Sequence, residues 1–343
     1  MSTIVDVSRL AGVSKATVSR VINGTGQVKP STRESVFAAM KQLSYQPDKV
    51  AQALAASKNH TIALVLSNYD SLLWSALMEQ IMLYAQSEHK KLMIVDSHDD
   101  PDNECKIIRK IEGQCDAIVL FSHSLSDTQI QALHDQLSVP LILLNRNSAS
   151  DSCHSVCLDQ EQLVSTAMDH LVISGHRNIA CITGPVDTSA GQERLRGYKR
   201  ALKKYKLPQS SSLIQTGDYH IRSGYEACHN LLKLGAPFSA LIAFNDDMAL
   251  GAIRALTEAG IKVPEQVSVI GIGNDPHGEF STPELTTVEL PTAQIAKQTV
   301  DMAMTLCEKN PDDKPRECRP VKVTGKLISR NSVVPYHAQK CWL

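Results

Sequence analysis

The sequence lacks any apolar run of about 18 residues, the length that a membrane-spanning helix requires. Its N-terminus also lacks the apolar segment of a secretory signal peptide. Its nine cysteines are an odd number without the spacing of a disulfide framework, a usage typical of a reducing compartment. These absences predict a cytoplasmic protein with no membrane partner.

The short motifs of common enzymes are missing as well: there is no G-x-S-x-G elbow, no G-x-x-x-x-G-K-S/T phosphate loop and no H-E-x-x-H helix. We interpret the carboxylate pair within residues 245–247 as a ligand contact combined with a helix cap. Cys153 and Cys157 would lie roughly 13 Å apart on an extended strand, too far for one tetrahedral zinc ion. The sequence therefore predicts no catalysis, no cofactor and no metal site.

Charge is nearly balanced over the 343 residues, with a net value of −1, but it is unevenly distributed. Residues 1–60 hold eight Lys or Arg against three Asp or Glu, a net charge of +5, so the other 283 residues carry −6. Lys and Arg that neutralise phosphates supply most of the sequence-independent affinity for DNA. Only the N-terminal segment is expected to meet a polyanion, and the length favours two or three domains.

Three short helices are predicted in this basic segment. Thr3, with Asp6 three residues later, can cap the first helix, and a glycine turn ends it. Ser14 begins the second helix, and Ser31 with Glu34 forms a capping-box pattern for the third. The apolar positions at helical spacing are Val5, Val7, Leu10, Val18, Val21, Ile22, Val36, Phe37, Met40 and Leu43.

Two helices joined by a glycine-containing turn, the second with short polar and basic side chains, form the helix-turn-helix that fits a DNA major groove. On the outward face of the second helix, Lys or Arg can reach guanine acceptors and Ala can touch a thymine methyl. A small helical cap with a solvated basic face is the alternative. The helical stretch after Pro47 is only about eight residues long, so it orders against a partner or remains a flexible linker.

From residue 61 onward, short apolar runs alternate with amphipathic helical patterns, as in parallel sheets covered on both faces. The runs are TIALVLS, LMIVDS, DAIVLFS, PLILLNR and HSVCLD, then NIACITG, SSLIQTG, SALIAFND and VSVIGIG. Helices are expected near residues 75–87, 102–112 and 127–137, then 160–173, 192–205, 222–234 and 247–259. The predicted fold is a small all-α helix-turn-helix head followed by an α/β core of two doubly wound parallel-sheet lobes.

TIVDVSRLAGVSKATVSRVING and TRESVFAAMKQLSYQPDKVAQALA resemble the DNA-binding head of the LacI/GalR family of bacterial transcription regulators. The resemblance continues in the family's order through GHRNIACITGP, ERLRGYKRAL, FNDDMALGAIRAL and PELTTVELP, and covers nearly the whole chain. Within the family, the sequence most resembles the galactose and β-glucoside repressors.

The resemblance implies a helix-turn-helix domain at residues 1–46, a hinge helix and linker at 47–60, and an effector-binding and dimerisation core at 61–343. The core's two lobes would be periplasmic-binding-protein-like. Lobe 1 would comprise about residues 61–159 and 291–320. Lobe 2 would comprise about residues 160–290 and 321–335, and TTVEL would cross back to the first lobe. The hinge helix would pair with its dimer mate in the minor groove and wedge Leu54 between bases. The implied DNA-binding residues are Thr3, Ser14, Lys15, Ala16, Thr17, Ser19, Arg20, Asn23, Ala51 and Leu54.

Ligands of open α/β sheets bind beyond the carboxyl ends of the strands, which places an effector between the two lobes. By resemblance, Arg194 matches the family's effector arginine, Asn245 its ligand asparagine and Tyr219 an aromatic neighbour. A lobe-bridging salt bridge is the alternative for Arg194, and plain packing is the alternative for Tyr219 and Trp74. The predicted effector-binding residues are Ser67, Trp74, Asn145, Arg194, Tyr219, Asn245 and Asn274.

The loop GIGND departs from the family pattern. Many members read GFDD or GYDD, so Gly273 stands where their aspartate would grip sugar hydroxyls. Either Asn274 or Asp275 substitutes from a shifted loop, or the effector is larger or differently hydroxylated than a simple hexose.

These patterns together predict a homodimeric repressor of carbohydrate-utilisation genes. It would bind a pseudo-palindromic double-stranded DNA operator under the allosteric control of a sugar or glycoside. The alternative is a cytoplasmic sugar-binding protein without regulatory DNA binding.

Overall fold

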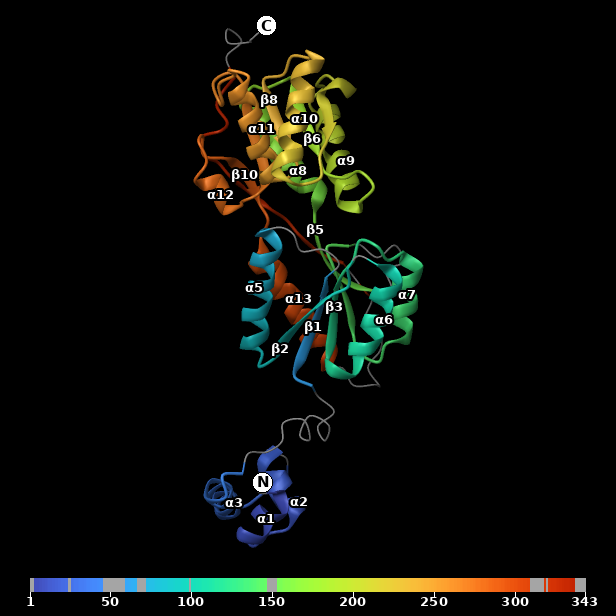
Figure 1. Ribbon diagram of the computed structural model, residues 1–343, viewed down its shortest axis with the longest axis vertical. Helices are drawn as coiled ribbons and strands as arrows, with labels where there is room; N and C mark the ends of the chain where they lie inside the picture. Colours follow the sequence, from blue (N-terminus) through green and yellow to red (C-terminus); the bar gives the residue numbers. More distant parts are fainter. Residues whose placement is uncertain are drawn as a thin grey trace. The chain divides into compact units, whose positions relative to one another are not determined.

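The computed structural model describes residues 3–23, 26–45, 59–66, 72–98, 100–146, 153–308, 318 and 320–336 (Figure 1). The chain divides into two units, Met1–His60 with Gln114–Asp116, and Thr61–Gly113 with Ala117–Leu343. Within the described residues, no helix is long and apolar enough to span a membrane.

The described residues of the first unit form the helices α1 (Ile4–Leu10), α2 (Lys15–Asn23) and α3 (Pro30–Gln42). The predicted cap of α1 is confirmed, because Thr3 Oγ1 accepts from the Asp6 backbone N–H while the Thr3 N–H donates to Asp6 Oδ2. Ser14 Oγ accepts from the Thr17 N–H at 3.1 Å at the start of α2. A small core of buried residues holds the helices together: Val7, Val18, Val21, Val36 and Ala39.

The third helix corrects two predictions. It begins at Pro30 with Lys29 as its N-cap and without a side-chain cap, so the capping box of Ser31 and Glu34 is wrong. Proline suits the first helical position because its fixed φ fits the helix and it has no N–H to satisfy there. Phe37 is 50% exposed and not in the core, where Ala39 is buried instead.

The first of two six-stranded sheets has the order β11-β5-β4-β3-β1-β2, with all neighbouring strands parallel. Figure 1 shows α5 and α13 on one face and α6 and α7 on the other. Its strands are β1 (Thr61–Leu66), β2 (Lys91–Asp96), β3 (Ala117–Phe121), β4 (Leu141–Leu144), β5 (His154–Leu158) and β11 (Pro320–Val323). Its helices are α5 (Leu72–Ser87), α6 (Pro101–Ile111), α7 (Asp127–Gln136) and α13 (Thr292–Cys307).

The second sheet has the order β12-β10-β9-β8-β6-β7, parallel except that β12 pairs antiparallel with β10. Its strands are β6 (Ile179–Thr183), β7 (Ile214–Thr216), β8 (Ala240–Ala243), β9 (Ser268–Gly273), β10 (Thr286–Glu289) and β12 (Lys326–Ile328). Its helices are α8 (Gln160–Ile173), α9 (Ser189–Lys204), α10 (Ile221–Leu234), α11 (Asp246–Glu258) and the short α12 (Pro276–Glu279). The strand expected at SSLIQTG is shortened to β7, because Ser211–Leu213 forms a 3₁₀ turn.

The chain passes between the two sheets three times: from β5 to α8, from β10 to α13 and from β11 to β12. The predicted crossing segment TTVEL contributes β10 to the second sheet, and the crossing follows it. β11 continues the first sheet to Val323, three residues past the expected limit at 320. The two-sheet α/β core with a helical head is the predicted fold, and it is confirmed.

Candidate functional site

Residues predicted to contact DNA lie on the face of α2 that points away from the small core. Lys15, Ala16 and Arg20 are exposed, whereas Val18 and Val21 are buried against the other helices. Neither Lys15 nor Arg20 forms a hydrogen bond or ion pair with another described residue. Their charges are therefore available to an external partner.

The remaining predicted DNA-binding residues fall into three groups. Thr3, Ser14 and Thr17 are joined in helix caps, with Ser14 Oγ 2.9 Å from Thr17 Oγ1 and Thr3 Oγ1 donating to Asp6 Oδ2 at 2.7 Å. Ser19 is half-buried. The structure does not describe Ala51, Leu54 or the side chain of Asn23. The prediction of a hinge helix therefore lies outside the described residues as well.

In the second unit, Arg194 of α9 is only 6% exposed. Its Nε donates to Gln160 Oε1 at 2.7 Å, and its Nη1 donates to the Phe244 carbonyl oxygen. Burial lowers the pKa of this guanidinium. Among the described residues no carboxylate forms an ion pair with it, so the salt-bridge alternative finds no support there.

Asn245 and Tyr219 meet directly. Asn245 caps α11 by accepting from the Met248 N–H at 3.0 Å, and its Nδ2 donates to the Tyr219 carbonyl at 2.6 Å. The Tyr219 ring centroid lies 6.0 Å from the Arg194 guanidinium carbon. The ring fits because residue 184 is glycine: a Cβ there would lie 2.1 Å from Tyr219 Cζ. The predicted residues Arg194, Tyr219 and Asn245 thus come together, Arg194 from α9 and the other two from the segments after β7 and β8, the strands on either side of β6.

Gln160, which the sequence analysis did not single out, connects this group to the first sheet. Its side chain is 3% exposed and donates through Nε2 to Asn145 Oδ1 at 3.0 Å, while its Oε1 accepts from Arg194. Asn145 follows β4 with a positive φ of 56°, and its N–H donates to the Val156 carbonyl. A glutamine at a helix start carries no sequence signal for burial, and only the tertiary partners identify it.

Trp74 and Asn274 make other contacts. The Trp74 ring packs on Phe121 with centroids 4.0 Å apart. Asn274 has a φ of 62° and accepts through Oδ1 from Arg330 Nη2 at 2.8 Å, so its amide oxygen is already engaged. Ser67 lies outside the described residues.

The carboxylate of Asp246 explains the glycine-rich loop. It is 2% exposed and accepts from Thr287 Oγ1 at 2.6 Å and from the Asp275 N–H at 2.8 Å, while burial raises its pKa to about 6. A Cβ at Gly271 would lie 2.1 Å from Asp246 Oδ1, and one at Gly273 would lie 3.1 Å from Oδ2. The departure at Gly273 therefore leaves room for a buried carboxylate next to it.

Potential metal ligands occur beside this loop. Within the described residues, one ligand atom each of Asp247, Asp275 and His277 lies within 4.8 Å of the other two.

The thiol of Cys157, by contrast, is not available as a thiolate ligand, because burial raises its pKa to about 11 and keeps it protonated.

Known protein families match parts of both units. A model of bacterial regulatory proteins of the lacI family matches residues 3–48, and a periplasmic binding protein-like domain matches residues 168–333. The HTH-type transcriptional regulator AscG of Escherichia coli strain K12 is 36% identical over 337 residues, covering 97% of this chain and 99% of that protein.

Two solved structures share the architecture over nearly the whole chain. The lac repressor dimer bound to operator and the anti-inducer ONPF superimposes with a TM-score of 0.84 at 26% identity, covering 97% of this chain and 99% of that one. The transcriptional regulator CelR in complex with cellobiose gives a TM-score of 0.71 at 28% identity, covering 97% of this chain and 100% of that one.

Proposed function

The chain belongs to the LacI family of bacterial regulatory proteins, and from this premise we propose that it is a cytoplasmic, homodimeric repressor of carbohydrate-utilisation genes. Its relatives are DNA-binding transcriptional regulators, which favours this function over a sugar-binding protein without DNA binding and over an enzyme. The domain limits that we propose are 1–46 for the head, 47–60 for the hinge and 61–343 for the core.

The observation that carries the proposal is the pair of exposed cations on α2, Lys15 and Arg20, which form no ion pair with another described residue, in a helix-turn-helix unit. A dimer would present two such helices to the half-sites of a pseudo-palindromic operator. Arg can donate to both acceptors of a guanine, and that contact contributes to sequence discrimination.

The test begins by selecting an operator from random duplexes with the full chain. Arg20→Ala should then weaken operator binding by about 1–3 kcal/mol and affect shuffled DNA much less. Arg33→Ala is the matched control, because Arg33 is an exposed arginine on α3 outside the predicted contacts. Equal losses on operator and shuffled DNA for Arg20→Ala would mean that this residue contacts only phosphate.

For the effector, we propose a sugar or glycoside bound by Arg194, Asn245, Tyr219 and Asn145, with Ser67, Trp74 and Asn274 as further contacts. The CelR complex with cellobiose supports the ligand class. The neutral partners of Arg194 support it as well, since a guanidinium without a carboxylate can still donate to hydroxyls.

A thermal-shift screen with cellobiose, lactose, galactose and glucose tests this assignment, because a ligand of the folded state raises Tm by mass action. Arg194→Ala and Asn245→Ala should abolish the shift of the active sugar and leave operator affinity without sugar nearly intact. Sugar binding retained by both variants would move the site elsewhere.

We further propose that the sugar acts through the hinge, where Leu54 of each protomer would wedge into the minor groove. Leu54→Ala should reduce DNA bending and operator affinity while leaving the sugar-induced thermal shift unchanged. Bending equal to that of the unaltered chain would rule out this hinge mechanism.

A further inference from the structure

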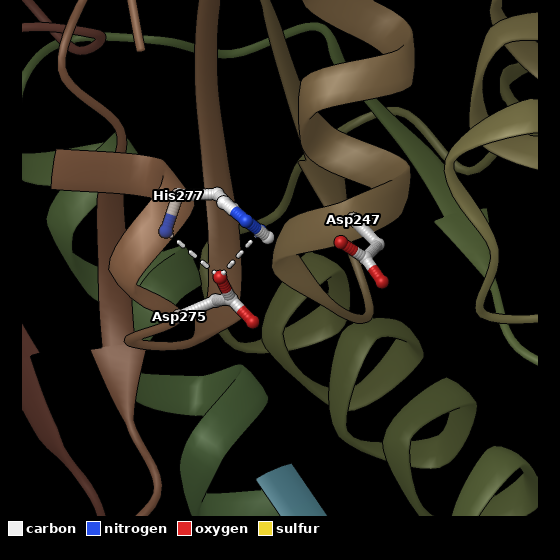
Figure 2. A group of neighbouring side chains, drawn as sticks. All are labelled: Asp247, Asp275 and His277. Carbon is white, nitrogen blue, oxygen red and sulfur yellow. Dashed lines mark hydrogen bonds and ion pairs between the residues drawn. The ribbon is translucent and has the colours of Figure 1, made fainter. Parts of the chain in front are cut away.

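A group of three ionisable side chains lies at the carboxyl end of the second sheet, outside the contacts proposed for DNA and sugar. Asp247 is in the first turn of α11, Asp275 is the N-cap of α12, and His277 is within α12. Figure 2 shows the three side chains converging from these two elements, and one ligand atom of each lies within 4.8 Å of the others.

Two members of the group are already held in position. Asp275 Oδ1 accepts from the His277 N–H at 2.8 Å and lies 3.1 Å from His277 Nδ1. The backbone N–H of Asp275 donates to the buried Asp246, which fixes the loop against the start of α11. These contacts order the short segment that carries Asp275 Oδ1 and the His277 imidazole.

Asp247 supplies an independent observation. Its carboxylate is half-buried, faces Asp275, and has no hydrogen-bond or ion-pair partner among the described residues. Burial and the negative charge of Asp275 raise its pKa, while His277 and His220 act in the opposite direction. Two carboxylates at this distance repel each other, and a cation held between them removes the repulsion.

The donor set selects the class of ion. Two carboxylate oxygens and one imidazole nitrogen suit a divalent transition metal, whereas calcium and magnesium prefer oxygen ligands alone. Zinc binds such ligands at about 2.0–2.2 Å, so tetrahedral donors lie about 3.4 Å apart. The separation of 3.1 Å between Asp275 Oδ1 and His277 Nδ1 is close to this value. The Asp247 ligand atom lies within 4.8 Å of the other two, so its side chain would have to move closer to coordinate the same ion.

We propose that Asp247, Asp275 and His277 form a binding site for a divalent transition-metal ion that ties α11 to α12, with water completing the coordination. Such an ion would fasten residues 273–277 beside Asn245, at the start of the same helix. The site does not depend on the identity of the operator or the sugar.

Zinc chloride is the probe, titrated by calorimetry into the full chain without an affinity tag, DNA or sugar. We expect one equivalent to bind at this site and Tm to rise. Asp247→Asn and His277→Gln should each weaken that binding roughly tenfold or more, because each removes a direct ligand. Asp275 is left unchanged because it also caps α12.

His98→Gln is the matched control, since His98 Nδ1 lies 2.9 Å from Asp96 Oδ2, a similar exposed His–Asp pair that is not in the three-residue group. It should leave zinc affinity unchanged. Absence of stoichiometric binding to the unaltered chain would overturn the proposal, and so would equal affinity in His277→Gln, even if Asp247→Asn failed to fold.

Discussion

The helical head and the two-sheet core place their functional side chains in opposite environments. In the head, Lys15, Ala16 and Arg20 are exposed on a helix whose other face is buried. In the core, Arg194 and Gln160 are buried and hydrogen-bonded to residues far away in the sequence. The head residues are thus accessible to an external partner, whereas the polar side chains of the core already form internal hydrogen bonds. A sugar bound as we propose would have to replace some of these bonds.

The largest expected difference between the two units is their tolerance of a lost core contact. Val18→Ala removes two buried methyl groups from a cluster of five buried residues, which costs about 2 kcal/mol. A unit of this size has little stability in reserve, so much of the head should unfold. We expect operator affinity to fall about tenfold or more, with faster hydrogen exchange confined to the head.

Val156→Ala in β5 is the matched control, because it removes the same two methyl groups from a fully buried position in the large core. It should lower the Tm of the core and leave hydrogen exchange in the head unchanged. Similar hydrogen exchange in the head of both variants would show that the head has more stability in reserve than its core suggests.

The same contrast explains which features the sequence could predict. Helical spacing identified Val7, Val18 and Val21, and β1–β9 were found because buried parallel strands are continuous apolar runs. The short strands β11 and β12 were not expected, since they lack such runs. The start of α3 was misplaced because Pro30 competes with Ser31 for it. The α13 helix was not expected at all.

Buried polar partners could not be predicted in this way. Nothing local distinguishes Gln160 from a solvated glutamine, because its partners Asn145 and Arg194 come from other elements. Asn274 was assigned to the effector by its place in the loop, but the structure pairs its amide oxygen with Arg330. Family resemblance supplied Arg194 and Asn245, and periodicity alone would not have found either.

The contrast between exposed and buried polar side chains can also be tested at Gln160, which is buried in the core. Gln160→Leu leaves Arg194 Nε and Asn145 Oδ1 buried without their partner, which should destabilise the core by about 1–3 kcal/mol. Gln192→Leu in the exposed face of α9 is the control and should change stability little. The check is the core's melting temperature in the full chain. Equal stability of the two variants would mean that water replaces the Gln160 amide.

The two units also differ in their expected pH response, because the described head residues 3–23 and 26–45 contain no histidine while the core buries His176. Its side chain is 2% exposed, with Nδ1 3.0 Å from Ser239 Oγ and Nε2 3.1 Å from the Val334 carbonyl. Burial lowers its pKa to about 4 from an ordinary value of 6.5. The folded core therefore disfavours the proton that the unfolded chain accepts.

This contribution to stability is complete above pH 6.5 and is lost as the pH falls from 6.5 towards 4, by at most about 1.4 kcal/mol per pH unit. Asp246 acts in the opposite direction, because its raised pKa of about 6 makes the folded state the better proton acceptor between 3.8 and 6. In the unaltered core these two effects partly cancel. His176→Gln removes the histidine contribution, so the stability of the variant core should fall less on acidification, or rise. The melting of the head, measured without DNA, should be the same in both proteins. Parallel pH curves for the two cores would mean that His176 accepts its proton without unfolding.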